Sequence, residues 1–184
     1  MKSLAVVLLA VVALCADIAS AQPSADAKAR GKFNFYGRSA GTAMRGARES
    51  TGSFQEYLRN TQPPTPQRVS EQPGVTIASP QVAQAAADEI GDSIAKSEKH
   101  LAWMRRQAEA SGDKETLASL DSIDRHLAAA KRSHATLCSC CLKDDIDAPA
   151  ATACCQTIDD ALGKAISEHD ALMKRLGEKT PSEK

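Results

Sequence analysis

The chain has 184 residues, in which 23 basic side chains balance 23 acidic ones, so its formal net charge is zero. A neutral chain has no overall field that would draw it to nucleic acid or to a membrane surface. The sequence contains no phosphate-binding loop, no dinucleotide-binding glycine motif and no zinc-protease motif. We therefore expect a protein that is not an enzyme and that has no nucleic-acid partner.

Residues 1–21 have the pattern of a secretory signal peptide. Lys2 gives a positive start, an apolar stretch runs from Leu4 to Leu14, and small residues end at Ala21, where we expect cleavage. The apolar stretch is too short to cross a bilayer as a helix, which takes about 20 residues. We therefore expect export to the periplasm or the extracellular space, where disulfides persist.

Residues 22–60 are rich in glycine and carry seven basic and three acidic side chains. They also hold every Phe and Tyr of the chain. Such a composition makes a poor core, so we expect a flexible arm whose few aromatic side chains pack on the folded domain. A second interpretation stays open, in which the basic residues between 28 and 48 contact an anionic component of the cell surface or its membrane. Residues 61–79 contain four prolines, which predict an extended linker.

From residue 80 onward, apolar residues recur at three-, four- and seven-residue spacing, which is typical of helices. Ser79 and Pro80 predict the start of a first helix. Gly112 predicts its end, Asp113 the start of a second, and Asp147 the start of a third. The expected fold is all-α, an antiparallel three-helix bundle over residues 80–178. Residues 179–184 are expected to be a disordered tail.

Five of the six cysteines gather where the second and third predicted helices turn back on each other: Cys138, Cys140, Cys141, Cys154 and Cys155. A reversal near residue 146 would set Cys138 level with Cys154, and Cys141 within a turn of Cys154 and Cys155. His134 lies one turn from Cys138 on the same helix face. Cys140 is expected to point away from this face, as the odd thiol.

The position of each pair on its helix predicts its reactivity. Cys154 and Cys155 fall in the first two turns of the third helix, where the helix dipole favours thiolates. Cys138 and Cys141 close the C-terminal end of theirs, where the dipole disfavours them. Redox catalysis is therefore the least favoured function of the cluster.

Two interpretations of the cluster remain. In the first, Cys138, Cys141, Cys154 and Cys155, with His134, bind or buffer a soft metal ion, Cu(I) or Zn, because thiolates select these ions. In the second, Cys138 or Cys141 forms a disulfide with Cys155, and the protein is a stapled structural or interaction module of the cell envelope with an unknown partner and no metal.

The histidines predict a second, weaker metal site. His100, His126 and His169 fall at similar heights on the three predicted helices, and three converging imidazoles could bind Zn or Cu with an open coordination position. In the competing interpretation, each histidine is satisfied separately by a neighbouring carboxylate such as Asp124 or Glu98.

Overall fold

The computed structural model describes residues 25–61, 79–141 and 146–178, and every element within them is helical. The chain divides into two compact units, residues 1–33 and 34–184. Of the first unit the structure describes only residues 25–33, the beginning of the first helix. The expected signal peptide, most of the proline-rich linker and the expected tail lie outside the described residues.

Three helices occupy the region predicted to be helical. They are α3 (Pro80–Ser111), α4 (Lys114–Cys141) and α5 (Ala148–Glu178). Gly112 ends α3 in the left-handed conformation, with a φ of 67°, which glycine adopts without steric cost. Pro80 occupies the first turn of α3, but Ser79 makes no capping bond, and its hydroxyl donates to the side chain of Gln81 instead.

Both predicted aspartate caps are formed. The carboxylate of Asp113 accepts a hydrogen bond from the backbone N–H of Thr116 over 3.0 Å. The carboxylate of Asp147 accepts one from the backbone N–H of Ala150 over 3.1 Å. Each carboxylate satisfies an orphan donor in the first turn of its helix, so α4 and α5 begin where the sequence predicts.

A fourth helix replaces the expected flexible arm, and the predicted count of three helices is therefore wrong for the described residues. This helix, α2, runs from Ala25 to Asn60. Its buried face is made of small residues and a few large apolar ones: Gly37, Ala40, Gly41, Met44, Ala47, Thr51, Phe54 and Leu58. The glycines weaken the helix by itself, but they also allow close packing, and burial of this stripe outweighs the low propensity.

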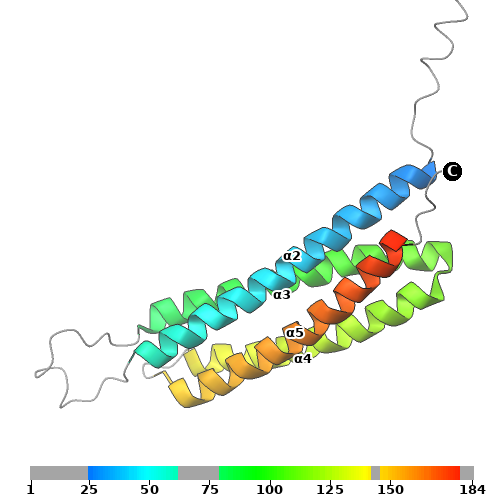
Figure 1. Cartoon of the computed structure of the whole chain (residues 1–184). Helices are drawn as coiled ribbons and strands as arrows, with labels where there is room; N and C mark the ends of the chain where they lie inside the picture. Colours follow the sequence, from blue (N-terminus) through cyan, green and yellow to red (C-terminus); the bar gives the residue numbers. More distant parts are fainter. Residues whose placement is uncertain (1–24, 62–78, 142–145, 179–184) are drawn as a thin grey trace, which may run out of the picture. The chain divides into compact units, whose positions relative to one another are not determined.

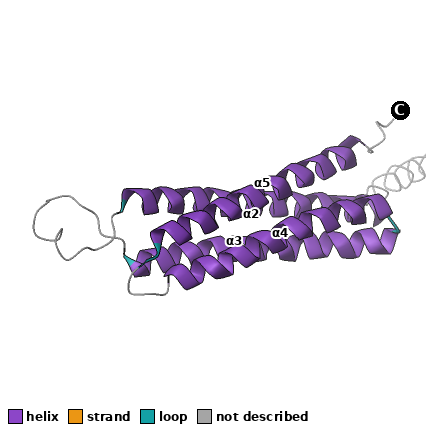
Figure 2. Cartoon of the chain, turned by 90° about the horizontal axis from the view of Figure 1, so that it is seen from below, coloured by secondary structure: helices purple, strands orange, loops and turns teal. Residues whose placement is uncertain are grey.

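Within residues 34–178, each helix runs antiparallel to the next, and the four helices lie side by side (Figures 1 and 2). Helix α4 packs between α3 and α5. Helix α2 contacts both α3, where Tyr36 stacks on Trp103, and α5, where Arg45 pairs with Asp170. The arrangement is thus a four-helix bundle with up-down-up-down topology.

The largest fully buried side chains come from all four helices: Met44, Ile90, Ile94, Leu101, Met104, Leu120, Ile123, Leu127, Leu137, Ile158, Leu162 and Leu172. This core is aliphatic, as the low aromatic content predicts. Among the described residues, no helix has both the length and the apolar character that a membrane span requires.

Candidate functional site

The cysteines lie at one end of the bundle, where α4 finishes and α5 starts (Figure 1). Cys138, Cys140 and Cys141 occupy the last turn of α4, and Cys154 and Cys155 the second turn of α5. A hydrogen bond from the hydroxyl of Ser133 to the backbone carbonyl of Cys154, over 3.1 Å, joins the two helices here. The reversal of the chain therefore brings the cysteines of both segments to the same end of the bundle.

The five thiols differ in burial, and none of these five described cysteines forms a disulfide. Cys155 is 0% exposed, Cys141 1% and Cys140 8%, whereas Cys138 and Cys154 are half-buried. The expectation that Cys140 points away from the cluster is wrong, since it is packed into the interior. Cys140 and Cys141, although adjacent in the sequence, both lie near enough to Cys155 of α5 to raise its pKa.

Electrostatic coupling shows that the thiols of α4 and α5 lie close together. Burial, the largest cause, acts together with the neighbouring Cys141, Cys154 and Cys140 to raise the pKa of Cys155 to about 12. Burial, the largest cause, and repulsion from Cys140, Cys138 and Cys154 together raise the pKa of Cys141 to about 11. Removal from water and the mutual repulsion of thiolates both favour the neutral thiol.

The predicted thiolate character of Cys155 is therefore wrong. Its place near the start of α5 lets the helix dipole favour an anion there, but Cys155 is completely buried, and the resulting desolvation raises its pKa instead. Burial dominates because the dipole is worth about 0.3–1 kcal/mol at most exposed sites, whereas moving a charge out of water costs several kcal/mol.

His134 lies against α3, and Cys138 lies beside it. Nε2 of His134 donates to the backbone carbonyl of Ala87 over 2.7 Å, and the Cys138 Sγ lies 3.5 Å from the same nitrogen. Burial and the negative charge of Asp88 on α3 raise the pKa of Cys138. The ring of His134 fills the space beside Gly91, where a Cβ would lie 2.6 Å from the ring. His134 thus serves the contact between α3 and α4.

The residues predicted to share one metal site therefore divide between two contacts. Cys141, Cys154 and Cys155 lie together with Cys140 between α4 and α5, while His134 bonds to α3. Cys138 lies between the two groups, because it is beside His134 and also raises the pKa of Cys141. Among the described residues, no three side chains of His, Cys, Asp or Glu are grouped so that they could hold a metal ion together.

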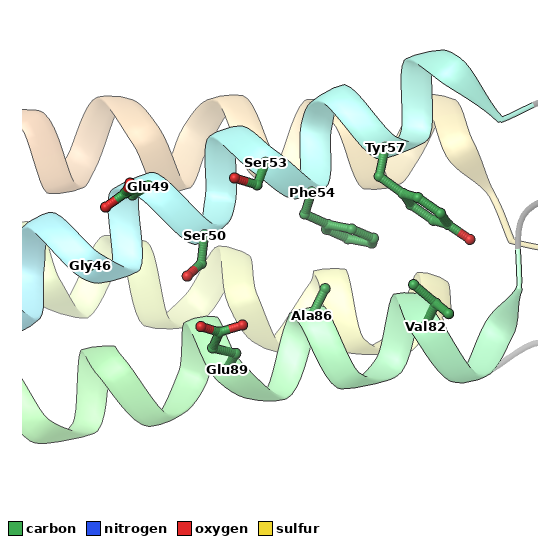
Figure 3. Close-up of a pocket in the computed structure, with 9 residues that line it drawn as sticks. All are labelled: Gly46, Glu49, Ser50, Ser53, Phe54, Tyr57, Val82, Ala86 and Glu89. Atoms are coloured by element: carbon green, nitrogen blue, oxygen red, sulfur yellow. The ribbon is translucent and has the colours of Figure 1, made fainter.

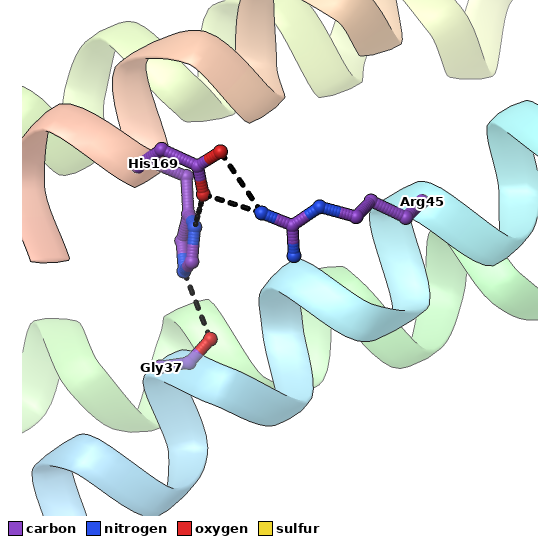
Figure 4. A network of polar contacts seen from close by, with 4 residues as sticks. Gly37, Arg45 and His169 are labelled. Carbon is purple, nitrogen blue, oxygen red and sulfur yellow. Dashed lines mark hydrogen bonds and ion pairs between the residues drawn. The ribbon is translucent and has the colours of Figure 1, made fainter.

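The three histidines of the second predicted site have separate partners. His169 is buried, and its Nε2 donates to the backbone carbonyl of Gly37 on α2 over 2.8 Å (Figure 4). His126 lies 3.3 Å from a carboxylate oxygen of Glu168. His100 packs beside Tyr36, with ring centroids 5.7 Å apart. The structure does not bring these imidazoles together, because each one contributes to a different contact between helices.

A polar seam between α2 and α5 was missed by the sequence analysis. The guanidinium of Arg45 donates to both carboxylate oxygens of Asp170, and that of Arg48 to both oxygens of Asp159. The arginines are three residues apart and so share one face of α2. The three-residue spacing of the arginines is visible in the sequence, but it indicates a shared face only if residues 34–60 are helical.

No family model matches the chain, and comparisons with the curated proteins and with the solved structures likewise find no match.

Proposed function

We propose that this protein binds a soft metal ion, Cu(I) in preference to Zn(II), through the thiols that α4 and α5 bring together. The observation that carries the proposal is that Cys141 and Cys155 are both buried on neighbouring helices, with Cys141 near enough to raise the pKa of Cys155. Soft sulfur ligands select Cu(I) and Zn(II). The function proposed is binding or buffering rather than catalysis, in a protein exported by way of residues 1–21.

The grouping of the ligands favours Cu(I). Structural zinc sites are almost always tetrahedral and take four protein ligands, whereas Cu(I) forms stable complexes with a pair of thiolates. In the described residues no three candidate ligands are grouped for a metal. Cys141 is nevertheless near enough to Cys155 to raise its pKa, as Cys140 and Cys154 do. A metal with a low coordination number suits this pair.

The raised pKa values have a consequence for binding. At neutral pH the thiols of Cys141 and Cys155 are protonated, so a metal ion must displace protons in order to bind. We expect Cu(I) affinity to increase with pH as the proton competes less well. The interior position of the two sulfurs would shield a bound ion from water and from oxidation.

The test is a titration of the reduced protein with Cu(I) under anaerobic conditions, in competition with a chromogenic Cu(I) chelator. We expect the wild-type protein to withdraw Cu(I) from the chelator, and Cys155→Ser and Cys141→Ala each to abolish this. Cys138→Ser is the matched control, because Cys138 lies beside His134 and is not among the thiols that raise the pKa of Cys155, so its loss should leave the stoichiometry unchanged. Full stoichiometry in the Cys141 and Cys155 variants, with unchanged thermal unfolding, would overturn the proposal.

A disulfide-stapled structural or interaction module is the second candidate, and the same burial of Cys141 beside Cys155 favours it. In an oxidising compartment the two thiols would give up two protons, and two electrons would pass to a disulfide oxidant. The bridge would close a loop of about 15 residues and stabilise the bundle by about 3 kcal/mol. Free-thiol counting on protein exported by its native route separates the candidates, since bridged thiols without metal support the module.

A further inference from the structure

A groove of about 470 Å³ lies between α2 and α3, away from the thiols (Figure 3). Its volume falls within the range of small-ligand and peptide sites. Phe54 and Tyr57 of α2 and Val82 of α3 line one end of it, and Glu49 of α2 and Glu89 of α3 the other. The groove thus has an apolar end and an acidic end, and no basic side chain lines it.

The apolar end leaves surface open to solvent. Val82 is 50% exposed, which makes it one of two large apolar side chains exposed to this degree among the described residues. The rings of Phe54 and Tyr57 extend from α2 towards it, with centroids 6.0 Å apart (Figure 3). The Tyr57 hydroxyl accepts a hydrogen bond from the backbone N–H of Ser79, which fixes the ring in place.

The acidic end has two carboxylates and no basic partner for either within the described residues. The arginines near Glu49 on α2, Arg45 and Arg48, are already paired with Asp170 and Asp159 on α5. Both glutamates are exposed on facing helices, so they give this end of the groove a negative potential that favours a cation. The groove is therefore complementary to a positive charge from outside the bundle.

The distance between the apolar end and the acidic end of the groove sets the length of a peptide that could contact both. Glu89 and Val82 are seven residues apart on α3, about 10 Å along the helix axis. Three residues of a peptide in the extended polyproline II conformation span about 9 Å, and because this conformation has three residues per turn, side chains three positions apart lie on the same side. A basic side chain and an apolar side chain separated by three positions would reach both ends at once.

We propose that this groove binds an extended basic segment of a partner protein. A Lys or Arg side chain lies between Glu49 and Glu89, and an apolar side chain three positions away packs on Val82 and Tyr57. This interaction is independent of the thiol cluster and of any metal bound there.

The probe is a blocked heptapeptide with a central lysine, leucine three positions to either side, and serine elsewhere, so that either chain direction presents the spacing. Binding to the purified protein is followed by nuclear magnetic resonance at about 0.15 M salt, where surface charges are partly screened. We expect shifts confined to the groove, and about tenfold weaker binding to the variant with both Glu49→Gln and Glu89→Gln.

The matched control is the variant with both Glu56→Gln and Glu109→Gln. It makes the same change in net charge at exposed sites on α2 and α3 outside the groove, and we expect it to bind the peptide as the wild type does. Equal weakening by the two double variants would overturn the proposal, as would unchanged binding of a peptide with the leucines moved next to the lysine. Spermidine binding as tight as the peptide would likewise show a site for small cations instead.

Discussion

The buried imidazole of His169 on α5 donates a hydrogen bond to the backbone carbonyl of Gly37 on α2, and its other ring nitrogen lies 3.3 Å from the carboxylate of Asp170 (Figure 4). Asp170 is also held by Arg45 of α2. The glycines of α2 make this contact possible, because a side chain at Gly37 or Gly41 would occupy the space that Met173 and His169 fill. The residues that suggested flexibility in the sequence are therefore those that let α2 dock.

A methyl group at Gly41 is expected to push α2 away from α5. A Cβ built at Gly41 would lie 2.8 Å from Cε1 of His169, closer than carbon atoms pack without strain. Because the His169 ring is held at both nitrogens, it has little freedom to move aside. We expect Gly41→Ala to lower the free energy of unfolding by about 1–3 kcal/mol in urea denaturation.

Gly52 provides the matched control for that substitution. A Cβ at Gly52 would have no atom within 4 Å, and Gly52 lies on the exposed face of the same helix. Alanine favours a helix over glycine by up to about 1 kcal/mol, so Gly52→Ala should stabilise the protein. If the two substitutions changed stability in the same direction, close packing at Gly41 would not be the reason that the helix needs glycine there.

Acid is expected to weaken the contact between α2 and α5. Burial of Asp170 tends to raise its pKa, but the hydrogen bonds from Arg45 and His169 outweigh this, so its pKa lies below the ordinary value. A lowered folded-state pKa means that the stabilisation is complete above the unfolded-state pKa of about 3.9 and is lost as the pH falls below it. The Asp170 side chain is 50% exposed, so the effect should be about 1 kcal/mol or less.

Denaturation of the wild type and of Asp170→Asn across the acidic range measures this effect. We expect the stability of the variant to change less steeply below about pH 4. Glu56→Asn serves as the comparison, because Glu56 is exposed and makes no contact with α5 that resembles the Asp170 pair. Identical pH profiles for Asp170→Asn and the wild type would show that Asp170 contributes nothing.

Alkali is expected to destabilise the reduced protein through Cys141 and Cys155. Their folded-state pKa values of about 11 and about 12 lie above the value of about 8.5 for an unfolded thiol. The folded state therefore keeps protons that the unfolded chain has lost, so stability is complete below about pH 8.5 and falls as the pH rises towards 11. Urea denaturation under reducing conditions should show a flatter profile for Cys155→Ala.

Burial also predicts the order in which the thiols react. The nucleophile is the thiolate, so the buried thiols with raised pKa, Cys141 and Cys155, should react with iodoacetamide about tenfold or more slowly than the half-buried Cys154. Peptide mapping by mass spectrometry after timed labelling measures this order. The control is labelling in denaturant, where the difference should vanish, and a native Cys155 that labelled first would contradict the burial described here.

The helix boundaries after residue 79 could be predicted because they depend on local chemistry. Pro80 suits a first helical turn, Gly112 adopts a left-handed conformation at no cost, and Asp113 and Asp147 bond backbone donors only three residues away. That Cys141 lies near Cys155 could also be predicted. The position of the reversal between two antiparallel helices sets which of their residues are neighbours. These features involve residues that are near one another along the chain or are related by a single turn.

What the sequence by itself determined is thus the all-helical class, the caps of α3, α4 and α5, and the end of the bundle at which thiols gather. The tertiary structure alone decided that residues 25–60 are helical, that Cys140 is buried, and that His134, His126 and His169 hold helices together separately. The physical reason is that burial depends on partners far away in the chain. Glycine is required on the buried face of α2 because Met173 and His169 of α5 fill the space beside it. The pKa of Cys155 is raised because desolvation in the core outweighs the dipole of its own helix.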